Sequence, residues 1–247
     1  MRRQLLTGLR MTVVLTIILG IIYPLVMTGA GQVLFPKQAN GSEVKDAQGK
    51  VVGSSLLGQL FTDAKGNAVA KYFQPRPSAA GDGYDPTSSS ATNLGPSNPN
   101  LIGNQVGTNP YATKADPYCV PVQATDKAGN DVTDSKGNPV YVKNADGSYQ
   151  CDPNTVGQRV LAYRALNGLS ATTKVPVDAV TTSASGLDPD ISVANARVQA
   201  ARVARARGVD VKTIDRLIAA RTRGRQLGFL GESTVNVLDL NLALDRV

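Results

Sequence analysis

The chain has 247 residues, enough to bury one core and still leave length for a membrane segment. It carries 26 lysines and arginines against 19 aspartates and glutamates, and it has no histidine and no tryptophan. Without histidine a Ser-His-Asp triad is excluded and most zinc sites are disfavoured, and two cysteines are too few for a thiolate zinc site. For these reasons we expect no resident metal. No basic run is interleaved with aromatic residues, so we also expect no nucleic-acid binding.

An apolar stretch near the N-terminus predicts a membrane anchor. No residue from Met11 to Pro36 is charged, and a helix needs about 20 apolar residues to span a bilayer. Arginines at positions 2, 3 and 10 precede this stretch, so the positive-inside rule predicts a cytoplasmic N-terminus (residues 1–10), a transmembrane helix (11–35) and an extracytoplasmic domain (36–247). The chain would then be a single-pass protein of the plasma (inner) membrane, in contact with the lipid bilayer. We also expect Pro24 to interrupt the helix.

The alternative to a retained anchor is a cleaved signal peptide with a small-residue site at Thr28-Gly29-Ala30. Its apolar core would be longer than is usual for such peptides, which favours the anchor. Both alternatives export the same domain.

Three similar octapeptides predict tight turns. They are Thr62-Asp-Ala-Lys-Gly-Asn-Ala-Val69, Thr125-Asp-Lys-Ala-Gly-Asn-Asp-Val132 and Thr133-Asp-Ser-Lys-Gly-Asn-Pro-Val140. Asp-x-x-Gly-Asn between β-forming residues is typical of a hairpin turn with glycine at positive φ. A calcium loop is the alternative, but its alternating acidic ligands and terminal glutamate are missing.

We interpret residues 111–153 as an inserted β-hairpin module. Cys119 and Cys151 flank it, and in an oxidising compartment they would most simply form one disulfide. Two free thiols are the alternative.

Helical periodicity begins after Pro153. The signals predict one helix that Gly168 ends, a second from Ser192 to Gly208, and a third that starts at Asp210 and ends near Gly224. Residues 235–245 fit a strand and a helix equally well. The fold class is therefore a single α+β domain behind the anchor. We interpret the arginines of the last two helices as solvated faces: Arg197, Arg202, Arg205, Arg207, Arg216 and Arg221.

A series of short motifs follows in chain order from the anchor to the C-terminal end. The motifs are Tyr23-Pro24, Phe35-Pro36, Ala39-Asn40-Gly41-Ser42, Gly53-Ser-Ser-Leu-Leu-Gly-Gln59, Tyr72-Phe-Gln-Pro-Arg-Pro-Ser-Ala79, the Asn-rich residues 88–99, Val175-Pro-Val177, residues 180–189, residues 202–208 and residues 235–245. In this order around one anchor they resemble the C subunit of Kdp-type potassium-transporting P-type ATPases. The resemblance covers nearly the whole chain apart from residues 111–153, which look extra relative to the family pattern.

The resemblance implies a non-catalytic accessory subunit of a high-affinity potassium uptake complex. The implied partners are a P-type ATPase subunit, a potassium channel-like subunit and a small membrane peptide. The chain has neither the Asp-Lys-Thr-Gly-Thr phosphorylation motif nor a GxxxxGK[ST] loop. We therefore expect no enzyme activity and no cofactor of its own, with ATP reached only through the ATPase subunit.

The family is also described as a catalytic chaperone that raises the ATP affinity of the ATPase subunit. Gln199 matches a glutamine proposed to contact nucleotide. Against this, a glutamine on a basic helix is usually solvated, and the predicted topology puts Gln199 outside while ATP is cytoplasmic. An indirect effect through the anchor is the alternative.

One further hypothesis concerns the polar loop at residues 76–100. Its carbonyl and hydroxyl groups, with Arg76, Asn93, Ser97 and Asn98, suit docking over the external entrance of a channel subunit, whereas the plainer interpretation is local turn formation.

The competing class of protein is a membrane-tethered exported binding protein or enzyme that acts alone. It would need its own pocket and would depend on carboxylates such as Asp188 and Asp190, which look more like a turn before Ser192.

Overall fold

A computed structural model describes residues 2–81, 83–89, 94–95, 97–103, 111, 113 and 116–247. Contacts divide the chain into two compact units, Met1–Leu57 and Gly58–Val247.

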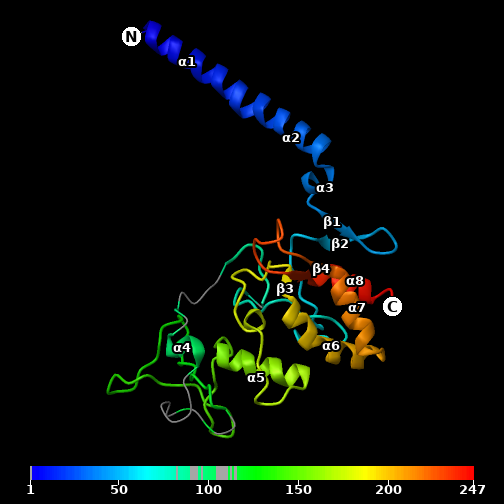
Figure 1. Ribbon diagram of the computed structural model, residues 1–247. Coiled ribbons are helices and arrows are strands. Elements are labelled where there is room, and N and C mark those ends of the chain that lie inside the picture. The colour runs from blue at the N-terminus through cyan, green and yellow to red at the C-terminus, as the bar shows by residue number, and fades with distance from the viewer. Residues whose placement is uncertain are drawn as a thin grey trace. The chain divides into compact units, whose positions relative to one another are not determined.

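The first unit is dominated by one long apolar helix (Figure 1). Helix α1 (Arg2–Ile17), the π-helical turn η1 (Ile18–Ile22) and α2 (Tyr23–Leu34) follow one another without a break. The whole stretch Arg2–Leu34 is long and apolar enough to cross a membrane. Its apolar core is not buried within the chain, so this surface is available to lipid or to another protein. The helix predicted for residues 11–35 is present and begins earlier, at Arg2.

The interruption expected at Pro24 takes the form of the π-helical turn. The backbone N–H of Tyr23 donates to the carbonyl of Ile18, five residues earlier. A proline ring clashes with the carbonyl four residues before it, here that of Gly20. The wider turn accommodates this clash, so the helix continues past the proline.

A short helix and a hairpin complete the first unit. They are α3 (Pro36–Ala39) and the antiparallel strands β1 (Glu43–Lys45) and β2 (Val51–Ser54). Asp46 closes the hairpin turn, since its Oδ1 accepts from the backbone N–H groups of Gln48 and Lys50, both at 2.9 Å.

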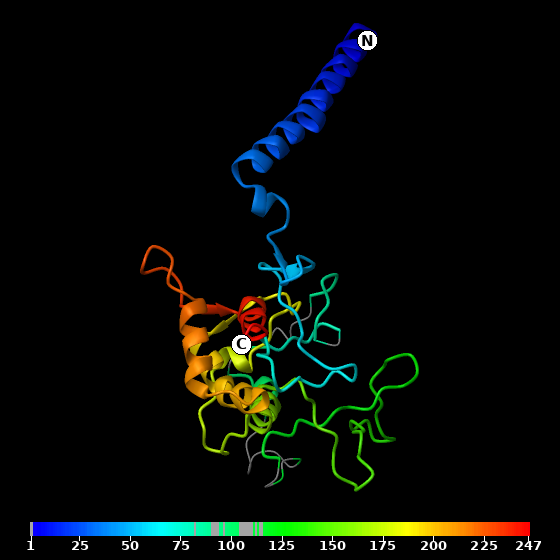
Figure 2. The ribbon, with the colours of Figure 1, turned by 90° about the vertical axis from the view of Figure 1, so that its right-hand side faces the viewer.

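The second unit is built on a three-stranded antiparallel sheet with the order β3-β5-β4. The strands are β3 (Asp190–Ser192), β4 (Thr222–Arg223) and β5 (Thr234–Asn236). Helices α6 (Val193–Arg207), α7 (Val211–Arg221) and α8 (Val237–Leu244) pack together against it (Figures 1 and 2). The buried core consists of Phe73, Ile191, Ala196, Ala200, Val203, Ala204, Ile214, Ile218, Val235, Val237, Leu240 and Leu244.

Three smaller elements lie around this core. Helix α5 (Val156–Asn167) contacts α6, the short α4 (Pro99–Ile102) contacts α5, and the 3-10 turn η2 (Val177–Ala179) contacts β3. An α+β fold is thus confirmed for the second unit.

The predicted helix boundaries are confirmed by their caps. Ser192 Oγ accepts from the N–H of Asn195 at 3.0 Å, and Asp210 accepts from the N–H of Lys212, also at 3.0 Å. Gly168 and Gly208 end α5 and α6 in the left-handed conformation, where a side chain would be unfavourable. The third helix ends at Arg221, slightly before the predicted stop.

The ambiguous C-terminal segment contains both of the structures considered for it. Strand β5 ends at Asn236, and α8 begins at the next residue. Asn236 makes this change possible, because its Oδ1 accepts from the N–H of Asp239 at 3.0 Å and so caps α8.

The predicted octapeptide turns are confirmed. In the second of them Asp126 Oδ1 accepts from the N–H groups of Ala128 and Asn130, and Gly129 has φ +85°. Asp63 and Asp134 do the same in the other two. Hydrogen bonds from Asn130 lower the pKa of Asp126. Because these carboxylates bind their own backbone, the turns do not favour calcium.

Candidate functional site

Two side-chain amides hold one extended segment of the second unit from opposite sides. We call residues 70–78 the clamped segment. Asn241 of α8 accepts from the N–H of Phe73 at 2.8 Å and donates to its carbonyl at 3.0 Å. Gln199 of α6 accepts from the N–H of Gln74 at 2.8 Å and donates to its carbonyl at 3.1 Å. A primary amide has the same donor and acceptor as a peptide group, so each side chain replaces a neighbouring strand.

Arg202 crosslinks the clamped segment to two helices. Its Nη1 donates to the carbonyls of Ala70 (2.6 Å) and Tyr72 (3.0 Å), its Nη2 to Gln199 Oε1 (2.7 Å), and its Nε to Asn167 Oδ1 (2.9 Å). Arg202 is only 5% exposed, and burial lowers its pKa. A buried guanidinium is tolerated when its donors are paired, and here the acceptors are neutral oxygens.

The interpretation of Arg202 and Gln199 as solvated side chains is therefore wrong, whereas Arg197 and Arg205 are exposed as predicted. Both atoms of the Gln199 amide group are occupied by protein partners. Nucleotide contact by Gln199 stays a prediction, and it would require the side chain to leave this network.

The network continues along α6 toward its first turn. Gln199 Nε2 donates to Asn195 Oδ1 at 2.9 Å, and the Tyr163 hydroxyl donates to the same oxygen at 2.8 Å. Asn195 Nδ2 donates to Asp178, whose carboxylate also accepts from the N–H and hydroxyl of Ser192. Burial, with a smaller contribution from Asp178, raises the pKa of Tyr163. Amides, a guanidinium and a neutral phenol can position a backbone, and this arrangement contains no activated nucleophile.

Arg76 extends from the clamped segment between two prolines. Its Nη1 pairs with Asp188 Oδ2 at 2.7 Å, and its Nη2 donates to the Thr182 carbonyl at 3.3 Å. The next residues are also fixed, since the N–H of Ser183 donates to the carbonyl of Pro77 at 2.8 Å. The Arg76 side chain nevertheless keeps 27% of its surface exposed. It is thus both tied internally and accessible.

The other residues of the docking hypothesis lie around α4. Ser97 is exposed, and the carbonyl of Asn98 accepts from the N–H groups of Leu101 and Ile102, both at 3.1 Å. These backbone bonds belong to the first turn of α4 and do not involve the Asn98 side chain, so both the docking hypothesis and its alternative stay predictions. Asn93 lies outside the described residues.

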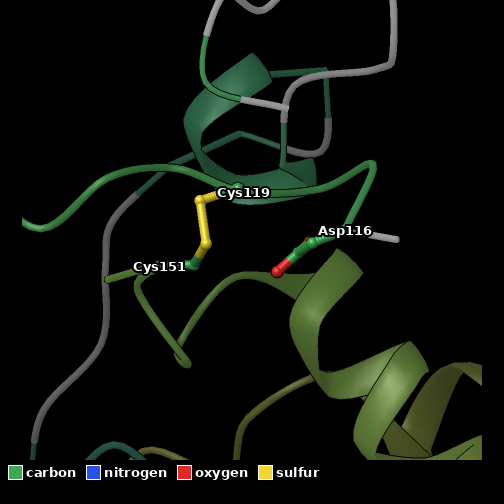
Figure 3. Close-up of side chains that lie close together, drawn as sticks. All are labelled: Asp116, Cys119 and Cys151. Carbon is green, nitrogen blue, oxygen red and sulfur yellow. A yellow bond between two sulfur atoms is a disulfide. The ribbon is translucent and has the colours of Figure 1, made fainter. Parts of the chain in front are cut away.

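Cys119 and Cys151 form a disulfide, with the Asp116 carboxylate beside it (Figure 3). These three groups lie close enough to suggest metal ligands. However, disulfide sulfurs are not thiolates, and metals bind thiolates. Asp116 is also engaged, since it accepts from Gln158 Nε2 at 2.6 and 2.8 Å. The cluster does not fit a metal and instead joins this segment to α5.

The comparison with known proteins identifies the family. A family model described as KdpC, K+-transporting ATPase, c chain, matches residues 5–132 and 144–246. The chain belongs to the KdpC family. Motifs that are far apart in this KdpC-family sequence meet at the clamped segment, because Phe73, Gln74, Arg202 and Asn241 all come from them.

Curated relatives match over their full length. A protein of Mycobacterium tuberculosis (strain ATCC 25618 / H37Rv) is 45% identical over 247 residues, covering 100% of both chains. Proteins of Geobacter sulfurreducens and Koribacter versatilis are 41% and 40% identical and cover 99% of this chain and 98% and 95% of their own. All three are named potassium-transporting ATPase KdpC subunit.

The part outside the family model is narrower than the predicted insertion. Only residues 133–143 fall between its two matched ranges, compared with the predicted 111–153. The mycobacterial relative also aligns over the whole chain. Most of the segment therefore lies within the family pattern.

Asn241 and Asn195 were missed as functional residues. Asn241 sits in the apolar run Leu238-Asp-Leu-Asn-Leu-Ala-Leu244, and it is buried. An unpaired buried amide is costly, so a lone asparagine in such a run indicates a fixed hydrogen-bond partner. That signal could have identified Asn241, although not Phe73 as its partner.

Proposed function

We propose that this chain is the non-catalytic accessory subunit of a high-affinity, ATP-driven potassium uptake complex. Its role is to stabilise the assembly of a channel-like subunit with a P-type ATPase subunit, together with a small membrane peptide. The names of the curated relatives support this role. The observation that carries it is the use of Gln199, Arg202 and Asn241 to fix a backbone segment. The segment that they fix also carries Arg76, whose side chain is 27% exposed and is available to a partner.

In this proposal the apolar helix Arg2–Leu34 anchors the chain in the plasma membrane. Arg2, Arg3 and Arg10 favour a cytoplasmic N-terminus, so the second unit would lie outside the cytoplasm. A disulfide between Cys119 and Cys151 is compatible with that compartment.

The docking contact is assigned to Arg76 and to the polar loop with Asn93, Ser97 and Asn98. The two prolines beside Arg76 and its pair with Asp188 hold the guanidinium in one place while leaving it partly exposed. A pre-positioned polar group loses little entropy on binding, which suits the mouth of a channel subunit.

The test is assembly with substituted chains. The double variant Ser97→Ala/Asn98→Ala and the single variant Arg76→Ala should each lower the recovery of the partner subunits and potassium-stimulated ATP hydrolysis. Arg205→Ala, at an exposed arginine, is the matched control. Because Arg76→Ala also removes an ion pair, its thermal unfolding is measured alongside. Full assembly and transport with both test variants would disprove the docking contact.

The catalytic chaperone role is proposed to act through the clamped segment. Gln199 and Asn241 hold adjacent residues, yet only Gln199 is the proposed nucleotide contact. In the assembled complex Gln199→Ala and Asn241→Ala should therefore weaken the apparent ATP affinity of the ATPase subunit to a similar extent. A loss seen only with Gln199→Ala would instead indicate direct nucleotide contact.

A further inference from the structure

The turn between β4 and β5 carries three apolar side chains in solvent. Leu227 is 82% exposed, Phe229 69% and Leu230 46%. Figures 1 and 2 show this orange-red turn projecting from the strand ends, away from α6. We call residues 225–231 the apolar tip. Single exposed apolar residues are common on the surfaces of soluble proteins. A contiguous group of large apolar residues, however, usually indicates an interaction site.

The apolar tip has a defined backbone. Gln226 and Leu230 exchange two backbone hydrogen bonds, each of 2.9 Å. Leu227 has φ +53°, and Gly228 and Gly231 follow with φ +83° and +74°. The left-handed region is unfavourable for leucine. The turn therefore adopts a strained backbone conformation at Leu227. The Leu227 side chain is exposed to solvent there, so burial does not compensate for the strain.

Arginines surround the base of the apolar tip. Residues 221–232 contain Arg221, Arg223 and Arg225 but only one acidic residue, Glu232. Arg225 pairs with Glu232 at 3.1 Å, and Arg223 pairs with Asp239 at 3.3 Å and with Asp190 at 3.9 Å, but both arginines remain about half exposed. An apolar end next to half-exposed guanidinium groups, which are paired with carboxylates, matches the change from acyl chains to phosphate-bearing headgroups at a bilayer surface.

We propose that the apolar tip inserts into the interfacial layer of the bilayer that holds the N-terminal helix, with the arginines against lipid phosphates. The same chain supplies the reason for choosing a bilayer. The second unit begins at Gly58, directly after the unit that contains the helix ending at Leu34. Even if it were fully extended, the link of residues 35–57 would span at most about 80 Å, so a bilayer that holds the helix is within reach of the second unit. The proposal does not depend on which side that surface is, nor on the partner subunits.

The experiment exploits the lack of tryptophan in the chain. Phe229→Trp introduces the single tryptophan of the chain at the apolar tip, and its emission is excited selectively in the full-length protein reconstituted in nanodiscs of phosphatidylcholine and phosphatidylglycerol. Val177→Trp, at an apolar residue that is 72% exposed, is the matched control. Both sites are on the surface, so both variants should unfold at the wild-type temperature.

We expect blue-shifted emission for Phe229→Trp and at least twofold stronger quenching than for Val177→Trp by lipids brominated near the headgroup. Lowering the phosphatidylglycerol content, or adding Arg225→Glu, should weaken that quenching. Emission typical of water with equal, weak quenching at both sites would overturn the proposal. So would a blue shift that arises only when other subunits of the complex are added, because the tip would then be a protein contact.

Discussion

Gln199 pairs with the backbone of Gln74 through two hydrogen bonds, as a neighbouring strand would. Asn241 pairs in the same way with Phe73, the preceding residue. Successive residues of an extended chain direct their backbone groups to opposite sides. The clamped segment is thus hydrogen-bonded on both edges by helices, and its geometry depends on three buried polar side chains, those of Gln199, Arg202 and Asn241.

Removing the Asn241 amide should destabilise the second unit strongly. Asn241→Ala leaves the N–H and carbonyl of Phe73 buried without partners, and each unpaired group costs about 1–3 kcal/mol. We expect a loss of about 2–5 kcal/mol in the free energy of unfolding, measured by denaturant titration of the full chain in detergent. Asn154→Ala, at an exposed asparagine, should change it by less than about 0.5 kcal/mol. Equal effects of the two substitutions would show that the clamp is not structural.

Arg202 should not tolerate lysine. A single ammonium group cannot reach Ala70, Tyr72, Asn167 and Gln199 together, because it lacks the fork of the guanidinium. Arg202→Lys should therefore cost about 3 kcal/mol, given about 1.5–3 kcal/mol for each hydrogen bond to a charged group. Arg205→Lys, at an exposed arginine three residues further along α6, should be close to neutral. The same stability for both variants would contradict the buried role of Arg202.

Tyr163 should make stability fall at alkaline pH. Burial raises its pKa in the folded chain, above the value of about 10 for an unfolded tyrosine. The stabilisation from the neutral phenol is fully present below about pH 10 and is lost as the pH rises above it. We expect Tyr163→Phe to be less stable at neutral pH and to lose stability less steeply above pH 10, as measured by thermal unfolding across pH. Identical pH profiles would show that Tyr163 ionises freely.

The disulfide should stabilise mainly its own segment. Cys119 and Cys151 are 32 positions apart, and closing a loop of that size contributes about 3–4 kcal/mol. Replacing both cysteines by serine should make residues 119–151 the first site of limited proteolysis, while α6, α7 and α8 stay protected. Cleavage at unchanged rates would indicate that the turns hold the segment without the bond.

The anchor and the helix ends were predictable because their signals are local. An uncharged apolar run, Ser192 and Asp210 at helix starts, and Gly168 and Gly208 at helix ends each act within a few residues. The clamp was not predictable, since Phe73 and Asn241 are 168 residues apart. Gln199 and Arg202 were misread as solvated for a physical reason. A buried polar face of a helix has the same spacing as a solvated one, and only the packed partners distinguish them.

Membership of a complex is tested most directly by purification from the native membrane. The tagged full-length chain would be extracted in mild detergent from cells grown under potassium limitation, and the co-purifying proteins would be identified and quantified. We expect a P-type ATPase and a multi-span channel-like protein in a fixed ratio to the chain, maintained through size-exclusion chromatography. Recovery of the chain alone, from membranes in which both proteins are detected, would contradict the accessory-subunit role and favour an exported protein that acts by itself.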